Sequence, residues 1–227
     1  MTAPILEIAA VTKQYGALRP LRIELLSLSE GDHVALLGFD QPAAEVLINL
    51  MTGATLPDTG HVRVFGRATA DIADSTDWLA TLDRFGIVSE RAALLEPMTV
   101  IQNLAMPFSL QIEPPPPEIA RQAAALASEA GVEEAVWERR VGDLDAATRL
   151  RVRLARALAL DPAVLLLEHP SAALSRDDAT LFARDVRAIA TRRGAAALTI
   201  TADAGFAASA SARTLVLEPA TGRLKRR

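Results

Sequence analysis

The stretch LLGFDQPAAEVLINLMTG, residues 36–53, decides the fold class of this sequence. An apolar strand runs into a turn at Gly38, and a helical pattern follows as far as Gly53. The apolar positions of that pattern are Val46, Leu47, Leu50 and Met51. Strand, tight turn and helix N-terminus form the layout of a phosphate-binding loop, in which backbone N–H groups point at an anion. Residues 38–46, however, contain no Lys, Ser or Thr, and Glu45 stands where the helix is expected to start.

Strand and helix signals alternate along the rest of the chain and predict an α/β fold. Strands are expected at 5–11, 21–28, 32–38, 60–66, 85–90, 163–170, 196–202 and 213–219. Helices are expected at 118–130, 147–160 and 177–193. The proline run at 113–117 predicts a stiff connector, and residues 222–227 are expected to form a solvated basic tail.

Composition restricts the class of protein. The net charge of −4 disfavours a nucleic-acid binder. With no cysteine, disulfides and Cys-ligated metals are excluded, which suits a reducing cytoplasm. The N-terminal residues lack the pattern of a signal peptide, and no apolar run approaches the roughly 20 residues needed to span a bilayer. The sequence predicts a chain that is soluble or at most peripheral on a membrane.

The order of these segments resembles the ATP-binding-cassette ATPases, which are the nucleotide-binding subunits of ABC transporters. The similar stretches cover nearly the whole chain: VTKQYGAL, GDHVALLG, LINLMTG, PDTGHVRVFG, PMTVIQNLAMPF, RLARALALDPAVLLLEHPSAAL and LVLEPATGRL. The resemblance implies a P-loop fold with a mixed sheet core, at about 1–89 and 160–227. It also implies a helical subdomain at about 90–159.

The phosphate loop departs from the family pattern G-x-x-G-x-G-K-S-T. Gly38 is kept. Five positions differ: Gln41 and Ala43 replace glycines, Ala44 the Lys, Glu45 the Ser and Val46 the Thr. The Lys neutralises phosphate oxygens and the hydroxyl ligates Mg²⁺, so both functions are expected to be lost. Pro42 removes one further N–H from the loop. By resemblance, the nucleotide-facing positions are Tyr15 at the adenine and Gly38, Asp40, Ala44, Glu45 and Glu90 around the phosphates.

The remaining family motifs change in the same way. Glu90 replaces the Gln that senses Mg²⁺ and the γ-phosphate. The signature L-S-G-G-Q is replaced by Leu144, Asp145, Ala146, Ala147 and Thr148. Glu168 is a tolerable exchange for the Asp of the metal strand. Three more positions lose the family residue: His169 replaces the Glu that polarises water, Ala202 the switch His, and Ser175 the Asp that couples paired sites.

His169 admits two interpretations. A neutral His can act as a general base near neutral pH. The alternative is a polar residue at a strand end, held by a neighbouring carbonyl or water. The other histidines, His33 and His61, show no metal-ligand spacing with it, so no metal site is predicted.

The sequence therefore predicts a pseudo-ATPase that keeps the fold and the docking surfaces and hydrolyses little or no ATP. By resemblance, its partners are a transmembrane permease subunit and an active ABC ATPase paralogue, in a dimer or heteromer on the inner face of the membrane. No cofactor is expected, and ATP with Mg²⁺ would bind weakly at best. Two alternatives stay open: an ATP-hydrolysing subunit with divergent motifs, and a stand-alone interaction module.

Two local hypotheses follow. Glu45 is expected to serve as a built-in anion at the helix N-terminus, or else to point to solvent. Leu94, Leu95, Met98 and Met106 are expected to form an apolar patch that docks on the permease, or else to pack in the core of the helical subdomain.

Overall fold

The computed structural model describes residues 3–227 and places two β-sheets around one helix. The larger sheet has the order β10-β9-β3-β8-β7-β6. Its strands are β3 (His33–Leu37), β6 (Phe85–Val88), β7 (Val164–Glu168), β8 (Ala196–Ile200), β9 (Arg213–Glu218) and β10 (Arg223–Arg226). All neighbours in it are parallel except β9 and β10. This arrangement confirms the predicted α/β class.

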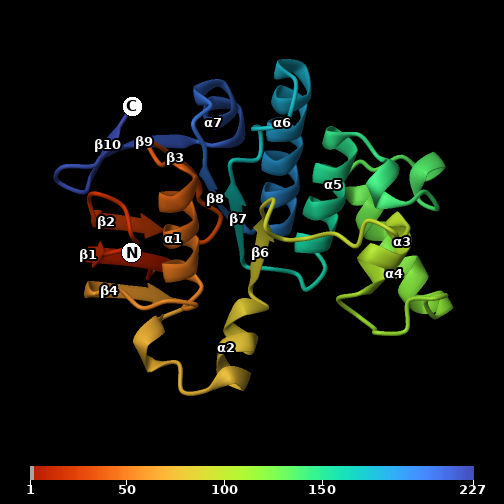
Figure 1. Cartoon of the computed structure of the whole chain (residues 1–227), viewed down its shortest axis with the longest axis horizontal. Coiled ribbons are helices and arrows are strands. Elements are labelled where there is room, and N and C mark those ends of the chain that lie inside the picture. The colour runs from red at the N-terminus through yellow and green to blue at the C-terminus, as the bar shows by residue number, and fades with distance from the viewer. Residues whose placement is uncertain (1–2) are drawn as a thin grey trace.

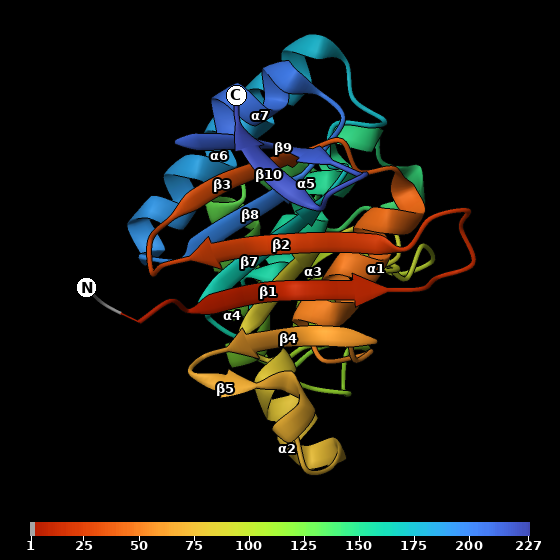
Figure 2. The same cartoon turned by 90° about the vertical axis from the view of Figure 1, so that its left-hand side faces the viewer.

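The smaller sheet is antiparallel and has the order β2-β1-β4-β5. Its strands are β1 (Leu6–Lys13), β2 (Leu21–Leu28), β4 (Thr59–Val64) and β5 (Arg67–Ala68). Figure 2 shows this sheet face on, with helix α1 (Gln41–Met51) behind it. Apolar side chains of α1 and of both sheets share one core, which explains why Ala44, Leu47 and Leu50 are fully buried.

Helix α2 (Ser75–Leu82) lies beyond β4 and β5 of the smaller sheet (Figure 2), whereas the remaining helices cover the other side of the larger sheet and extend away from it. They are α3 (Val100–Ala105), α4 (Pro117–Glu129), α5 (Ala146–Ala157), α6 (Arg176–Arg193) and α7 (Ala204–Ala210), with short 3-10 turns at Thr69–Asp71, Glu134–Val136 and Val141–Asp143. Figure 1 shows α3, α4 and α5 together at one end of the molecule. A second core joins these helices to β7 and α6. The division into a sheet core and a helical subdomain at about 90 and 159 stays a prediction.

Strand β7 separates the two cores because its side chains alternate between them. Val164 and Leu166 face the core of α1, whereas Leu165 and Leu167 face the core of α5 and α6. Every residue of β7 is buried, as expected for a parallel strand covered on both faces. Its last residue, Glu168, therefore lies at the carboxyl ends of the parallel strands, where α1 begins.

Three sequence expectations were wrong in detail. The basic C-terminal tail forms β10, which pairs with β9 and whose Lys225 bonds Glu218. Helices α2, α3 and α7 were not predicted, because each is shorter than the roughly 11–18 residues over which helical periodicity can be recognised. Helix α1 begins at Gln41, so Glu45 is its fifth residue and lies beyond the first turn.

Candidate functional site

The turn between β3 and α1 has the layout of a phosphate loop, and Asp40 accepts hydrogen bonds from two backbone N–H groups at the start of α1. Gly38 has φ of +89°, and a Cβ there would lie 3.2 Å from the carbonyl oxygen of Leu217, so glycine is required. Asp40 caps the helix: its Oδ1 accepts from the N–H of Ala43 at 2.9 Å, and its carbonyl accepts from Ala44 at 2.9 Å. Pro42 has no N–H to offer. A carboxylate of the chain itself thus fills the anion position at this helix N-terminus.

Glu45 does not fill that position, so the hypothesis of Glu45 as the built-in anion was wrong. Its side chain points from the second turn of α1 towards Arg91, and Oε1 lies 3.2 Å from Nη1 of that arginine. The alternative, that Glu45 points to solvent, agrees with its 44% exposed side chain. It did not foresee the ion pair with Arg91. The physical reason is the earlier start of α1, which gives the first turn to Asp40.

Glu168 is the centre of the site. Its side chain is fully buried. Gln41 donates from Nε2 to Oε1 at 2.6 Å. Ser89 donates from Oγ to Oε2 at 2.7 Å, and Arg91 donates to the same oxygen from Nε at 3.2 Å and Nη2 at 3.0 Å. Because a buried carboxylate is tolerated only when it is paired and hydrogen-bonded, this set of donors satisfies the charge within the chain.

Arg91 bridges the two carboxylates. Its guanidinium contacts Glu168 through Nε and Nη2 and Glu45 through Nη1. The planar fork of an arginine suits this task, because its several donors point in fixed directions. Arg91 follows β6 closely in sequence, so the pairing also attaches this segment to α1 and β7.

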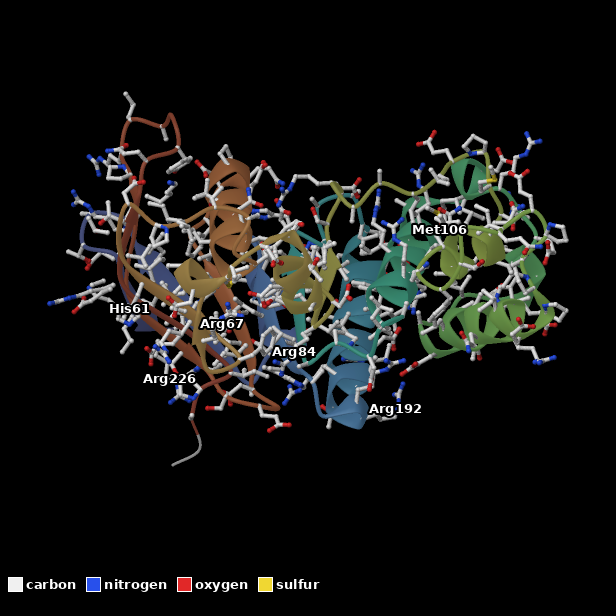
Figure 3. All side chains as sticks on the ribbon, turned by 90° about the horizontal axis from the view of Figure 1, so that it is seen from below. His61, Arg67, Arg84, Met106, Arg192 and Arg226 are labelled. Carbon is white, nitrogen blue, oxygen red and sulfur yellow. The ribbon has the colours of Figure 1, made fainter. Side chains whose placement is uncertain are left out.

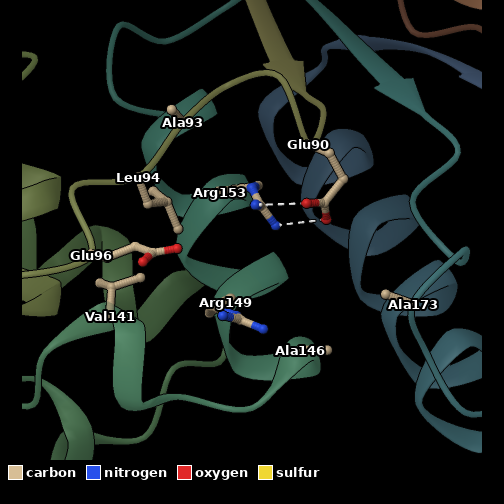
Figure 4. Close-up of a pocket in the computed structure, with 9 residues that line it drawn as sticks. All are labelled: Glu90, Ala93, Leu94, Glu96, Val141, Ala146, Arg149, Arg153 and Ala173. Atoms are coloured by element: carbon tan, nitrogen blue, oxygen red, sulfur yellow. Dashed lines mark hydrogen bonds and ion pairs between the residues drawn. The ribbon is translucent and has the colours of Figure 1, made fainter.

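Glu90, the neighbour of Arg91, turns to the opposite side and binds α5. Arg153 donates to both carboxylate oxygens, from Nη1 at 2.9 Å and from Nη2 at 2.9 Å. Figure 4 shows this pair at the edge of a pocket of about 360 Å³. The pocket is lined by Glu90, Ala93, Leu94, Glu96, Val141, Ala146, Arg149, Arg153 and Ala173.

The signature stretch forms the start of α5. Leu144 is buried and Asp145 is the N-cap, accepting from the N–H of Thr148 at 2.8 Å and from its hydroxyl at 2.7 Å. These hydrogen bonds, the backbone one first, lower the pKa of the Asp145 carboxyl. Ala146 and Ala147 follow, half-buried, in the first turn. The stretch therefore places a carboxylate at the N-cap of α5, followed by the methyl groups of two alanines.

His169 follows Glu168 with φ of +42°, an uncommon conformation for a residue other than glycine. Its N–H donates to the carbonyl of Ile200 at 2.8 Å, and its ring Nε2 is buried without a hydrogen-bond partner among residues 3–227. Ala202 is exposed and offers only a methyl group. Ser175 caps α6 and donates to Asp178 at 2.6 Å. Each of the three is thus placed at the end of a structural element, without a polar contact to the carboxylates around Arg91 in the described part of the chain.

Tyr15 lies near the loop. It lines a cavity of about 180 Å³ together with Gly38, Asp40 and Ala43. Partial burial, and after it the negative charge of Asp40, raises the pKa of the Tyr15 hydroxyl. The structure therefore brings Tyr15, Gly38 and Asp40 to one side of the α1 N-terminus and Glu45 and Glu168 to the other.

Sequence reasoning did not find Arg91, Ser89 or Arg153, and it considered Gln41 only as a lost glycine. The available signal was charge balance. Glu45 and Glu168 are two carboxylates at the same site and need a positive counter-charge. Arg91, directly after the predicted strand at 85–90, is a cation that could supply it.

The four apolar residues proposed for docking divide between core and surface. Leu94 is 9% exposed and belongs to the core of the helical end. Leu95 is exposed, whereas Met98 and Met106 are half-buried. Met106 lies at the surface of the α3 end in Figure 3.

The group implied by the resemblance, ATP with Mg²⁺, does not fit these residues. Asp40 holds the helix N-terminus, and Ala44 is fully buried in the apolar core. The guanidinium of Arg91 lies on the carboxylate that would otherwise bind a metal ion. Within residues 3–227 there is no group of three or more His, Cys, Asp or Glu side chains that could hold a metal ion.

A model of the family described as ABC transporter matches residues 24–172. The sulfate/thiosulfate import ATP-binding protein CysA of Caulobacter vibrioides is 31% identical over 215 residues, which are 92% of this chain and 61% of that protein. The ribose import ATP-binding protein RbsA 2 of Rhizobium etli is 32% identical over 83% of this chain and 37% of its own length. The chain thus spans between about a third and three fifths of these two relatives.

Solved structures agree with the fold. The dimeric structure of MJ0796, described as a bacterial ABC transporter cassette, has a TM-score of 0.79 and 22% identity, with 97% of each chain covered. The structure of cbiO1 from Clostridium perfringens, part of the transporter complex cbiONQ, has a TM-score of 0.82 and 18% identity. It covers 99% of this chain and 88% of that one. Across residues 3–227, no helix is both long and apolar enough to cross a bilayer.

Proposed function

This chain belongs to the ABC transporter family, and we propose that it is a degenerate ATP-binding subunit. In this proposal it acts as a structural or regulatory partner in a membrane transport complex and hydrolyses little or no ATP. The single observation that carries the proposal is the pairing of Arg91 with the buried Glu168. The carboxylate of Glu168, at the end of β7, is neutralised by Arg91 of the same chain and is not available to a metal ion.

The residues around this pair support the same conclusion. Ala44 cannot neutralise a phosphate, and Asp40 and Glu45 bring negative charge to the loop. His169 has a buried ring nitrogen without a partner, so nothing among the described residues orients it as a general base. Loss of one electrostatic contact to a transition state typically costs about 2.7–4 kcal/mol, and several are missing here.

The partner in this proposal is a membrane-embedded permease subunit, which would hold the chain on the inner face of the membrane. An active ATP-binding paralogue is the proposed second partner. The names of the relatives support a role in transport, since CysA and RbsA 2 are import ATP-binding proteins and LolD of Chromohalobacter salexigens belongs to a lipoprotein-releasing system. LolD is 29% identical over 81% of this chain and 76% of its own length.

The test is ATP hydrolysis by the purified protein with Mg²⁺. We expect phosphate release at the level of a sample without protein, and no change in His169→Ala. Arg121→Ala serves as the matched surface control, since Arg121 is exposed on α4, away from the Glu168 contacts and the pocket of Figure 4. Turnover that is abolished in His169→Ala and retained in Arg121→Ala would contradict the proposal and favour an ATP hydrolase with divergent motifs.

A further inference from the structure

We infer that Arg91 is the permanent cation of this site, taking the place in which Glu45 and Glu168 would otherwise hold a divalent metal ion. This inference rests on the proposed function, because a site filled by the chain's own cation has no need of Mg²⁺ or ATP. Without the Arg91 side chain, the same oxygen atoms would be open to a hard divalent cation.

The geometry around the guanidinium is that of a cation between carboxylates. Nη2 and Nε lie 3.0 and 3.2 Å from one oxygen of Glu168, and Nη1 lies 3.2 Å from Glu45. Burial strengthens the contact to Glu168, because a fully buried carboxylate is screened little by water or salt. Glu45 is the half-exposed and weaker of the two partners.

The side chains that would remain without Arg91 all offer oxygen. Glu168 and Glu45 are carboxylates, Ser89 has a hydroxyl, and Gln41 has an amide oxygen after rotation of its amide group. Hard cations such as Mg²⁺ and Mn²⁺ prefer oxygen ligands and are commonly held by one or two carboxylates with water. Arg91→Ala would therefore leave a buried, uncompensated carboxylate beside three further oxygen ligands.

Two sets of hydrogen bonds hold the segment that carries Arg91. The N–H of Arg91 donates to Ser89 Oγ at 3.1 Å, which fixes the backbone next to the donor of Glu168. The adjacent Glu90 is held by Arg153 of α5 with two contacts of 2.9 Å. The segment 89–91 is thus attached to β7 and α1 on one side and to α5 on the other, which holds the backbone of Arg91 within reach of Glu168.

The experiment compares thermal unfolding of the wild type, Arg91→Ala and Arg91→Lys, each titrated with MnCl₂ without nucleotide. We expect the wild type to show no shift. Arg91→Ala should unfold at a lower temperature, by up to roughly 20 °C, the upper end for breaking a buried ion pair, since Glu168 is fully buried but Arg91 is 37% exposed. Mn²⁺ should then raise its midpoint and show one bound ion by electron paramagnetic resonance. Arg121→Ala is the matched control and should show neither effect.

Second variants separate the outcomes. In Arg91→Ala/Glu168→Gln the Mn²⁺ effect should disappear, because the buried charge that attracts the ion is gone. If Arg91→Ala does not fold, Arg91→Lys decides: its single ammonium should keep the fold at reduced stability and still exclude Mn²⁺. Binding of Mn²⁺ to the wild type, or Arg91→Ala as stable as the wild type and indifferent to Mn²⁺, would overturn the inference. ATP hydrolysis is not the readout, so this inference and the proposed function can fail separately.

Discussion

Asp145 illustrates how one residue can keep a structural role while the chemistry around it changes. Its carboxylate accepts two hydrogen bonds from Thr148, one from the backbone and one from the hydroxyl, at the start of α5. Asp and Ser are both good N-cap residues, so the helix begins correctly with either. The difference lies in charge, since Asp145 adds an anion at a position where the family resemblance implies a contact to a phosphate.

We expect Asp145→Ala to destabilise the protein by about 0.5–2 kcal/mol, the usual cost of losing an N-cap, and Asp145→Asn to cost much less. The pKa of the Asp145 carboxyl is lowered in the folded state, first by the backbone bond from Thr148 and then by the hydroxyl. Its stabilisation is therefore present above the unfolded pKa of about 3.9 and is lost as the pH falls through the lower folded value.

Urea unfolding at several pH values measures this effect. The wild type should lose stability relative to Asp145→Asn as the solution is acidified, because only the wild type can protonate its cap. A difference between the two proteins that stays constant with pH would show that the charge of Asp145 does not contribute.

The elements of the fold could be predicted where burial alone determines them. Strands β3 and β7 are buried at every position, and their apolar runs were recognised from sequence. Strand β10 was missed because its basic residues resemble a solvated tail, and only pairing with β9 makes it a strand. The start of α1 was also misplaced, since the sequence pattern begins at Val46 whereas Asp40 caps the helix several residues earlier.

The centre of the site could not be predicted in the same way. Gln41 and Glu168 are 127 positions apart in sequence. They meet only because α1 starts at the carboxyl ends of the parallel strands, where β7 ends. Arg91 joins both carboxylates through contacts between distant segments. The altered motifs predicted a loss of phosphate and metal contacts, whereas Arg91, the counter-charge of Glu168, could be identified only from the fold.

The segment between β6 and α3 holds the exposed part of the proposed docking surface. Asn103 of α3 is fully buried, and it accepts from the N–H of Leu95 at 2.8 Å and donates to the carbonyl of Leu95 at 3.0 Å. These contacts fix the backbone and leave the Leu95 side chain 39% exposed. Leu94 faces the core instead, so Leu95 is the residue whose substitution tests docking without disturbing the fold.

For Leu95→Glu we expect loss of the protein from the membrane fraction of its native cells, because a carboxylate would have to be desolvated at an apolar contact with the permease. Leu181→Glu on α6 is the matched control, since Leu181 is an exposed leucine on a different element. Sedimentation of membranes followed by immunodetection is the measurement, with circular dichroism to confirm folding. A wild type found entirely in the soluble fraction would favour a stand-alone interaction module.

Across the whole molecule, the two surfaces that the family resemblance assigns to nucleotide binding carry carboxylates. Asp40 and Glu45 lie at the loop, Asp145 lies at the signature, and neither stretch contains a lysine or arginine. The net charge of the chain is −4. Glu45 is paired with Arg91, so a polyphosphate between two copies would face chiefly Asp40 of one copy and Asp145 of the other. Like charges at short distance in a partly dehydrated interface are strongly unfavourable.

We therefore expect Mg-ATP to leave the oligomeric state of the purified protein unchanged. Analytical ultracentrifugation with and without Mg-ATP should give the same sedimentation coefficient, and the thermal midpoint should also stay constant, because a ligand that does not bind the folded state cannot stabilise it. Asp145→Ser with Glu45→Ser removes two of the carboxylates and serves as the comparison. The variant should still fail to dimerise with Mg-ATP, since Ala44 supplies no charge for the phosphates and Asp40 still caps α1. A wild type that dimerises with Mg-ATP would show that the loop binds nucleotide despite Asp40, and the degenerate-subunit proposal would then fail.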